Sequence, residues 1–139
     1  MQVRERAWDE GIGTGVESMD VEHRLQVSLV NALDEVIRSG RDDALAERTL
    51  QQLIDFTSVH FHSEELMMRL YSYPQLDNHA LAHAKLMENV ERIREHHRRG
   101  DQVEAADTIG ELRGWLVNHI KSMDQAFALW LSRNGYRAA

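Results

Sequence analysis

The sequence predicts an all-α fold, an up-down-up-down four-helix bundle with an irregular N-terminal arm. The chain of 139 residues has the length of one domain with a single core. It contains one proline, and 6% of its residues are aromatic, which disfavours a many-stranded β fold. Apolar residues recur at helical spacing in four segments that short turns separate, and this pattern is typical of a bundle.

The arm is expected to span residues 1–17 and the bundle residues 18–139. Gly11, Gly13 and Gly15 interrupt the arm, and Trp8 is expected to anchor it to the bundle. The first helix is predicted over residues 19–39. Ser18 is its expected N-cap and Gly40 its stop, and Leu25 and Leu29 belong to its apolar face.

The second helix is predicted to start at Asp42 or Asp43 and to end at Leu70. Pro74 is expected in the first turn of the third helix, predicted over residues 75–99 and stopped by Gly100. The fourth is predicted as one helix over residues 102–133, with a stop at residues 134–135.

The composition excludes several classes of protein. The formal net charge of -7 argues against nucleic acids and anionic membranes as partners. The absence of cysteine excludes disulfides, thiolate metal sites and cysteine nucleophiles. No apolar run approaches the ~20 residues of a membrane span, and no signal segment opens the chain, so the cytoplasm is the expected location.

Polar residues that bind metals recur on the predicted core faces of all four helices. Two pairs are spaced four apart and therefore share a helix face, His60 with Glu64 and His79 with His83. Each pair alone is usually incidental. Seven such groups converging in one core would be strongly destabilising without a cation. Imidazole and carboxylate ligands without thiolate suit iron, with manganese or zinc as lesser candidates.

One member fits poorly by spacing. Asp124 follows His119 by five residues, which places it about 140° away on a regular α-helix. Met123 would share the face of His119 instead. A local π-type widening of the helix could turn Asp124 inward.

The joint pattern of a histidine, HxxxE, HxxxH and HxxxxD, in that order, resembles the hemerythrin family over nearly the whole chain. The resemblance implies that His79, His83 and His119 bind one iron, and that His23 and His60 bind the other. It further implies that Glu64 and Asp124 bridge two iron ions (Fe²⁺/Fe³⁺), with an oxo or hydroxo group as third bridge. One coordination position then stays open on the two-histidine iron, where O2 is expected to bind.

Side chains next to these ligands are the expected walls of the O2 pocket. Plain core packing is the alternative role for each of them. They are Gln26, Phe61, Trp115, Leu116 and Ile120.

Gln26 departs from the family, which usually has an apolar residue there. If it faces the cavity, we expect faster autoxidation or altered O2 affinity. The alternative is that it turns toward solvent.

The other three histidines, His62, His96 and His97, are expected to bind no metal. No catalytic residue is predicted, since no general base is expected beside the site and Glu65 is expected to face away from it. The resemblance therefore implies a non-enzyme that binds O2 reversibly for storage, delivery or sensing, with NO as a second candidate ligand. As the input domain of a signalling protein, the chain would have a fused or separate effector as partner. A di-iron oxidase or peroxidase, and a bundle that sequesters iron or zinc, are the remaining alternatives.

Overall fold

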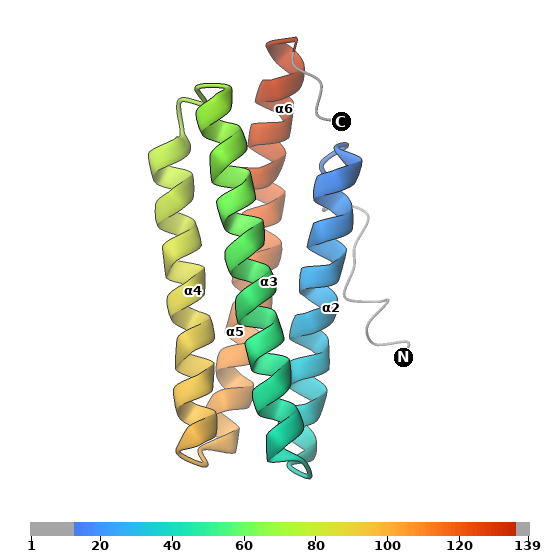
Figure 1. Cartoon of the computed structure of the whole chain (residues 1–139), viewed down its shortest axis with the longest axis vertical. Helices are drawn as coiled ribbons and strands as arrows, with labels where there is room; N and C mark the ends of the chain where they lie inside the picture. Colours follow the sequence, from blue (N-terminus) through green and yellow to red (C-terminus); the bar gives the residue numbers. More distant parts are fainter. Residues whose placement is uncertain (1–12, 136–139) are drawn as a thin grey trace.

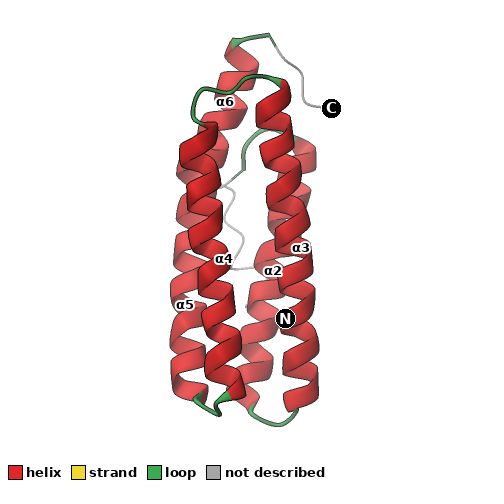
Figure 2. Cartoon of the chain, turned by 60° about the vertical axis from the view of Figure 1, so that its left-hand side comes forward, coloured by secondary structure: helices red, strands yellow, loops and turns green. Residues whose placement is uncertain are grey.

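The computed structural model describes residues 13–135, which form an antiparallel four-helix bundle. Helix α2 (Glu17–Ser39) descends in the view of Figure 1, α3 (Asp43–Leu70) rises, and α4 (Leu76–Arg98) descends again. The fourth helical segment of the bundle rises through α5 (Gln102–His119), the π-helical turn η2 (Ile120–Asp124) and α6 (Gln125–Arg133). Short loops join the helices at both ends of the bundle (Figure 2), and the predicted fold class is confirmed.

Capping residues explain several of the boundaries. Asp42 is the N-cap of α3, and its Oδ1 accepts a hydrogen bond from the backbone N of Leu45 at 2.9 Å. Gly40 ends α2 in the left-handed conformation with φ 61°, as predicted for the stop. Gly100 and Gly135 also have positive φ, each two residues after the last residue of α4 or α6.

Two predicted boundaries were wrong. Helix α2 begins at Glu17, so Ser18 lies inside it, and its N-cap residue is Val16. Asp20 instead ties down the preceding chain, because its Oδ1 accepts hydrogen bonds from the backbone N and the hydroxyl of Thr14, both at 2.8 Å. Pro74 lies in the turn before α4, whose first residue is Leu76. Residues 8 and 11, expected in the arm, lie outside the described part of the chain.

Two apolar clusters fill the bundle. The larger joins α2, α3, α4 and α5, and its fully buried members include Leu33, Leu50, Ile93 and Ile109. The smaller lies where α3 turns into α4 and consists of Met19, Met68, Tyr73, Phe127 and Leu131. Leu25 was predicted on the core face but is 51% exposed. The buried polar residues of the site separate the two clusters.

None of the helices in residues 13–135 is long and apolar enough to cross a lipid bilayer.

Candidate metal centre

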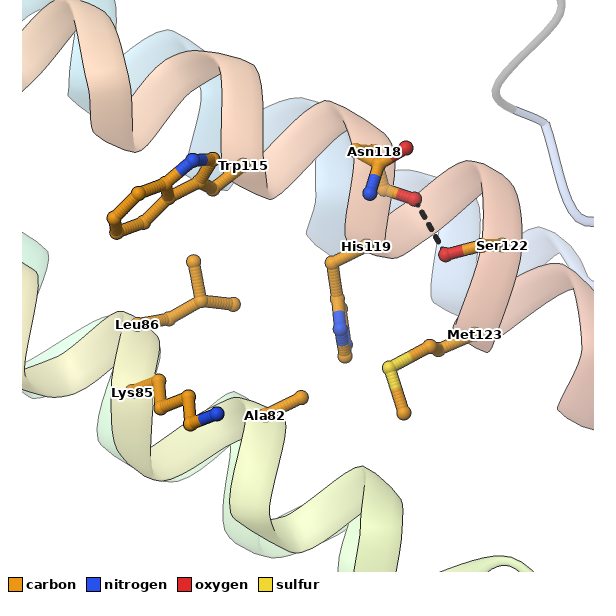
Figure 3. A pocket seen from close by; sticks show the side chains of 8 residues that line it. All are labelled: Ala82, Lys85, Leu86, Trp115, Asn118, His119, Ser122 and Met123. Atoms are coloured by element: carbon orange, nitrogen blue, oxygen red, sulfur yellow. Dashed lines mark hydrogen bonds between the residues drawn. The ribbon is translucent and has the colours of Figure 1, made fainter.

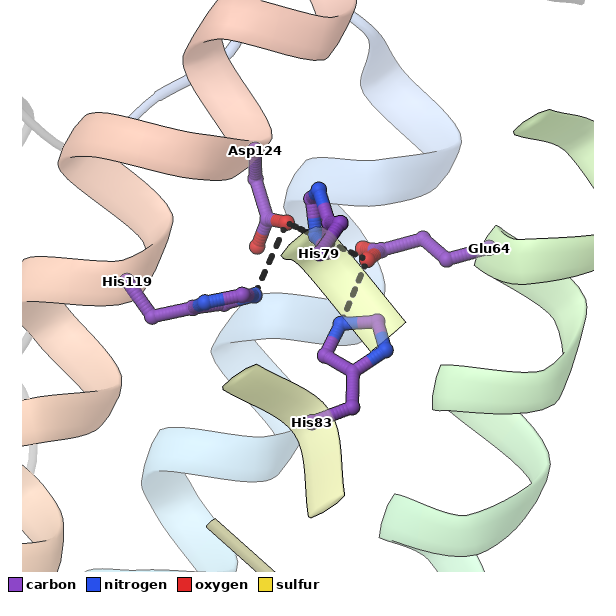
Figure 4. A group of neighbouring side chains, drawn as sticks. All are labelled: Glu64, His79, His83, His119 and Asp124. Carbon is purple, nitrogen blue, oxygen red and sulfur yellow. Dashed lines mark hydrogen bonds and ion pairs between the residues drawn. The ribbon is translucent and has the colours of Figure 1, made fainter. Parts of the chain in front are cut away.

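The predicted ligand residues come together in the interior. All seven side chains are at least 95% buried, and they project from all four helical segments of the bundle. Among the described residues, two groups have donor atoms close enough to share an ion. One is Glu64, His79, His83, His119 and Asp124, drawn in Figure 4, and the other is His23, His60 and Glu64.

Each carboxylate lies between the two groups of histidines. Glu64 Oε1 is 3.2 Å from His79 Nε2 and 3.1 Å from His83 Nε2, whereas its Oε2 is 3.2 Å from His60 Nε2.

Asp124 repeats the pattern. Its Oδ1 is 2.8 Å from His79 Nε2 and 3.2 Å from His119 Nε2, whereas its Oδ2 is 3.0 Å from His23 Nε2. Both carboxylates therefore direct one oxygen to a three-histidine side and the other to a two-histidine side.

The π-helical turn explains how Asp124 reaches this position. Because η2 is wound more loosely than an α-helix, Asp124 points inward and is 1% exposed. Met123, which a regular helix would place with His119, is only partly buried and lines a pocket on the outer side. The widened turn that the five-residue spacing requires is confirmed.

Two further carboxylates hold ligand histidines from behind. Glu22 Oε1 lies 2.6 Å from His60 Nδ1, and Glu65 Oε2 lies 2.8 Å from His83 Nδ1. When Nδ1–H donates to a carboxylate, the Nε2 lone pair stays available for a metal. The expectation that Glu65 faces away was wrong. The sequence did contain a signal for these two carboxylates, because Glu22 directly precedes the predicted ligand His23 and Glu65 directly follows the predicted ligand Glu64.

The charges of the cluster perturb its own titration. Burial alone lowers the pKa of His23 and of His79, but Asp124 and Glu64 outweigh it and raise each pKa to about 9. Burial likewise lowers the pKa of His60, yet Glu64 and Glu22 raise it overall. In the absence of metal, His23 and His79 are therefore protonated at neutral pH and attract the two carboxylates.

The same balance lowers the pKa of both carboxylates. Burial raises the pKa of Glu64, but the surrounding histidines bring it well below its usual range. For Asp124, burial and the charge of Glu64 raise the pKa, but the neighbouring His119, His23 and His79 rings lower it overall. Both groups are thus anions at neutral pH.

The donor set fits a pair of cations. His83 Nε2, His119 Nε2 and Glu64 Oε1 are buried and lie within 3.2 Å of another nitrogen or oxygen of the cluster, yet none of them makes a hydrogen bond of good geometry. Such atoms converge on common points rather than pairing with one another. Nitrogen and oxygen donors without sulfur suit iron, manganese or zinc.

The predicted pocket walls do not all lie in one place. Gln26, Phe61 and Leu116 border a small internal cavity. The Phe61 ring also stacks on His83, with ring centroids 3.8 Å apart. Ile120 is fully buried in the larger apolar cluster.

Trp115 lies elsewhere. It is 49% exposed and lines an open pocket of about 270 Å³ between α4 and α5 (Figure 3). The pocket reaches His119 from outside. Its other walls are Ala82, Lys85, Leu86, Asn118, Ser122 and Met123.

The three remaining histidines are outside both groups. His62 is exposed, and its Nδ1 bonds to the Ser58 carbonyl at 2.8 Å. His97 is buried at the far end of the bundle, 3.5 Å from Glu47. His96 also belongs to neither group.

Known proteins share this sequence and fold. A bacteriohemerythrin of Methylococcus capsulatus is 31% identical over 120 residues, which cover 86% of this chain and 91% of the relative. A myohemerythrin of Theromyzon tessulatum is 30% identical over 84% of this chain and 86% of the relative. A crystal structure of wild-type hemerythrin superposes with a TM-score of 0.77 at 29% identity, covering 90% of this chain and 96% of that one. The family model described as "Hemerythrin HHE cation binding domain" matches residues 14–131. With its buried histidine and carboxylate cluster, the chain belongs to the hemerythrin family.

Proposed function

We propose that the chain binds O2 reversibly at a pair of non-heme irons. The observation that carries the proposal is the position of Glu64 and Asp124, each with one oxygen toward the three-histidine side and one toward the two-histidine side. A bundle core built from facing helices is a known place for such two-metal sites.

The ligand assignment follows this asymmetry. His79, His83 and His119 would hold one iron, His23 and His60 the other, and Glu64 and Asp124 both, with an oxo or hydroxo group as third bridge. The two-histidine side has one protein ligand fewer, so it is the side for O2. When bound, the iron pair supplies the two electrons needed to hold O2.

The residues around the site favour binding without turnover. The predicted ligand side chains are at least 95% buried between two apolar clusters, which limits their contact with bulk water. The nearby carboxylates Glu22 and Glu65 are engaged with ring nitrogens, so neither is free to act as a general base toward a substrate. An O2-binding protein therefore fits better than an oxidase, and NO is a second small ligand of suitable size.

Storage or delivery of O2 is favoured over sensing through an effector by the architecture of one relative. The match covers 91% of the Methylococcus relative, which leaves little room for an effector domain in that protein.

The test is anaerobic reduction of the iron-loaded protein followed by air. We expect about two irons per chain and visible absorption that appears with O2 and disappears when O2 is removed. His119→Ala and Glu64→Gln should abolish it, whereas His62→Ala, which changes an exposed histidine of α3, should leave it intact. An iron-loaded protein whose spectrum ignores O2 would refute the proposal and favour sequestration.

A further inference from the structure

A buried polar pair lies one helical turn from the two-histidine side of the cluster. Gln26 on α2 follows His23 by three residues, and Thr57 on α3 precedes His60 by three. Because α2 and α3 run in opposite directions (Figure 1), both steps lead toward the same end of the bundle. Gln26 and Thr57 are each 2% exposed, so the Gln26–Thr57 pair is buried close to His23 and His60.

The Gln26–Thr57 pair borders the small internal cavity, whose other walls are apolar and include Phe61, Leu86 and Leu116. Its volume of about 10 Å³ is close to the smallest space that holds one water molecule. Gln26 therefore lies inside the molecule and does not turn toward solvent.

The amide of Gln26 is held at one end only. Its Nε2 donates a hydrogen bond to Thr57 Oγ1 at 3.2 Å, whereas its Oε1 is buried without a hydrogen-bond partner. An unpartnered buried carbonyl costs free energy, and native proteins satisfy nearly all of them. An acceptor without a partner beside a cavity of water size indicates a binding site for a hydrogen-bond donor. Thr57 Oγ1 offers the second polar contact that such a guest needs.

We propose that Gln26, positioned by Thr57, makes this cavity a site for one small hydrogen-bond donor such as water, and that this guest lowers the affinity for O2. The inference rests on the proposed function, since it takes the two-histidine side as the place where O2 binds. Free O2 has no proton to donate to Gln26 Oε1, so when it enters this cavity it must displace a guest that is hydrogen-bonded there. The chain would thus bind O2 more weakly than it would with apolar side chains at positions 26 and 57.

Gln26→Met and Thr57→Val test the proposal, because each removes one polar group and nearly preserves volume. Crystal structures of the metal-loaded proteins should show density for a guest within hydrogen-bond distance of Gln26 Oε1 in the unmodified chain and none in Gln26→Met. O2 titration should show affinity raised about fivefold in Gln26→Met, the ratio expected for one lost hydrogen bond. Thr57→Val should also raise the O2 affinity. It provides a second test of the proposal if Gln26→Met fails to fold.

Thr49→Val is the matched control. Its hydroxyl is also buried on α3 but donates to the Leu45 carbonyl at 2.8 Å, away from the cavity. O2 affinity should not change there. An empty cavity in the unmodified protein, or equal O2 affinity in it and both test variants, would overturn the inference. Failure of the unmodified protein to respond to O2 would refute the proposed function instead, and the guest density would still decide the hydrogen-bonding site.

Discussion

Glu22 and Glu65 bind no metal in the proposed centre, yet each is in contact with a histidine that does. Their carboxylates accept from Nδ1 of His60 and His83, which fixes the ring orientation and leaves Nε2 directed at Glu64. A carboxylate behind a ligand also increases the basicity of the ring. These residues are therefore positioning residues for the metal centre.

Glu65→Gln should weaken metal binding about 10- to 100-fold, because the amide no longer orients and polarises the His83 ring. Competition with a chelator measures the affinity, and the shift in the O2-dependent spectrum reports the changed ring. Glu88→Gln, at an exposed carboxylate of α4, is the control. Equal affinities in Glu65→Gln and the control would show that Glu65 has no positioning role.

Titration of the cluster predicts how the metal-free protein responds to pH. The pKa of His23 and of His79 is raised to about 9, so their stabilising effect is complete below the ordinary value of 6.5 and lost as pH rises through 9. The pKa of Glu64 is lowered from 4.5, so its contribution is present above that value and lost as pH falls.

The metal-free protein should therefore be most stable between about pH 4.5 and pH 6.5, and less stable at about pH 9. Chemical denaturation at several pH values measures this. Metal loading should move the optimum upward, because metal ions replace the protons. A metal-free stability that climbs steadily from pH 6 to 9 would contradict the assignment.

At the scale of elements, the π-helical turn η2 determines which side chain of the fourth helical segment points into the site. Its looser winding turns Asp124 inward and leaves Met123 at the outer pocket. The double variant M123D/D124M moves the carboxylate to the position that a regular helix would favour. Metal content should fall below two ions per chain, measured by elemental analysis, whereas Met123→Leu should retain both. Full metal content in the double variant would show that the turn does not select the ligand.

The Asp42 cap holds the start of α3, far along the helix from His60 and Glu64. Asp42→Ala should lower the free energy of unfolding by about 1 kcal/mol, since it leaves the Leu45 N–H without its partner. Metal content should stay unchanged. A loss of metal with the cap would mean that this end of α3 is coupled to the site.

At the scale of the whole molecule, the polar centre lies between two apolar clusters that hold the bundle on either side of it. Chelation should therefore leave the helical content intact by far-ultraviolet circular dichroism. Thermal stability should still fall, because ligand binding to the native state contributes about 2.7 kcal/mol at a metal concentration of 100 Kd, equivalent to roughly 10 °C in Tm. Complete unfolding on chelation would show that the apolar clusters are insufficient alone.

The sequence by itself determined the helices, their order and the histidine and carboxylate positions. Helical periodicity and the Gly40 stop are local properties, so the end of α2 and both ends of α3 were predicted almost to the residue. The start of α2 was missed because its N-cap residue, Val16, makes no side-chain capping hydrogen bond, so no local capping signal marks it.

Only the tertiary structure decided which way side chains turn where spacing is ambiguous. The loosened helix at Asp124, the contact of Glu65 with His83 and the burial of Gln26 against Thr57 all depend on neighbouring helices. Periodicity along one helix defines its faces, but the partner that each face meets is set by how four helices pack together. The sequence therefore determined which groups could bind metal, and packing decided how they are oriented and held.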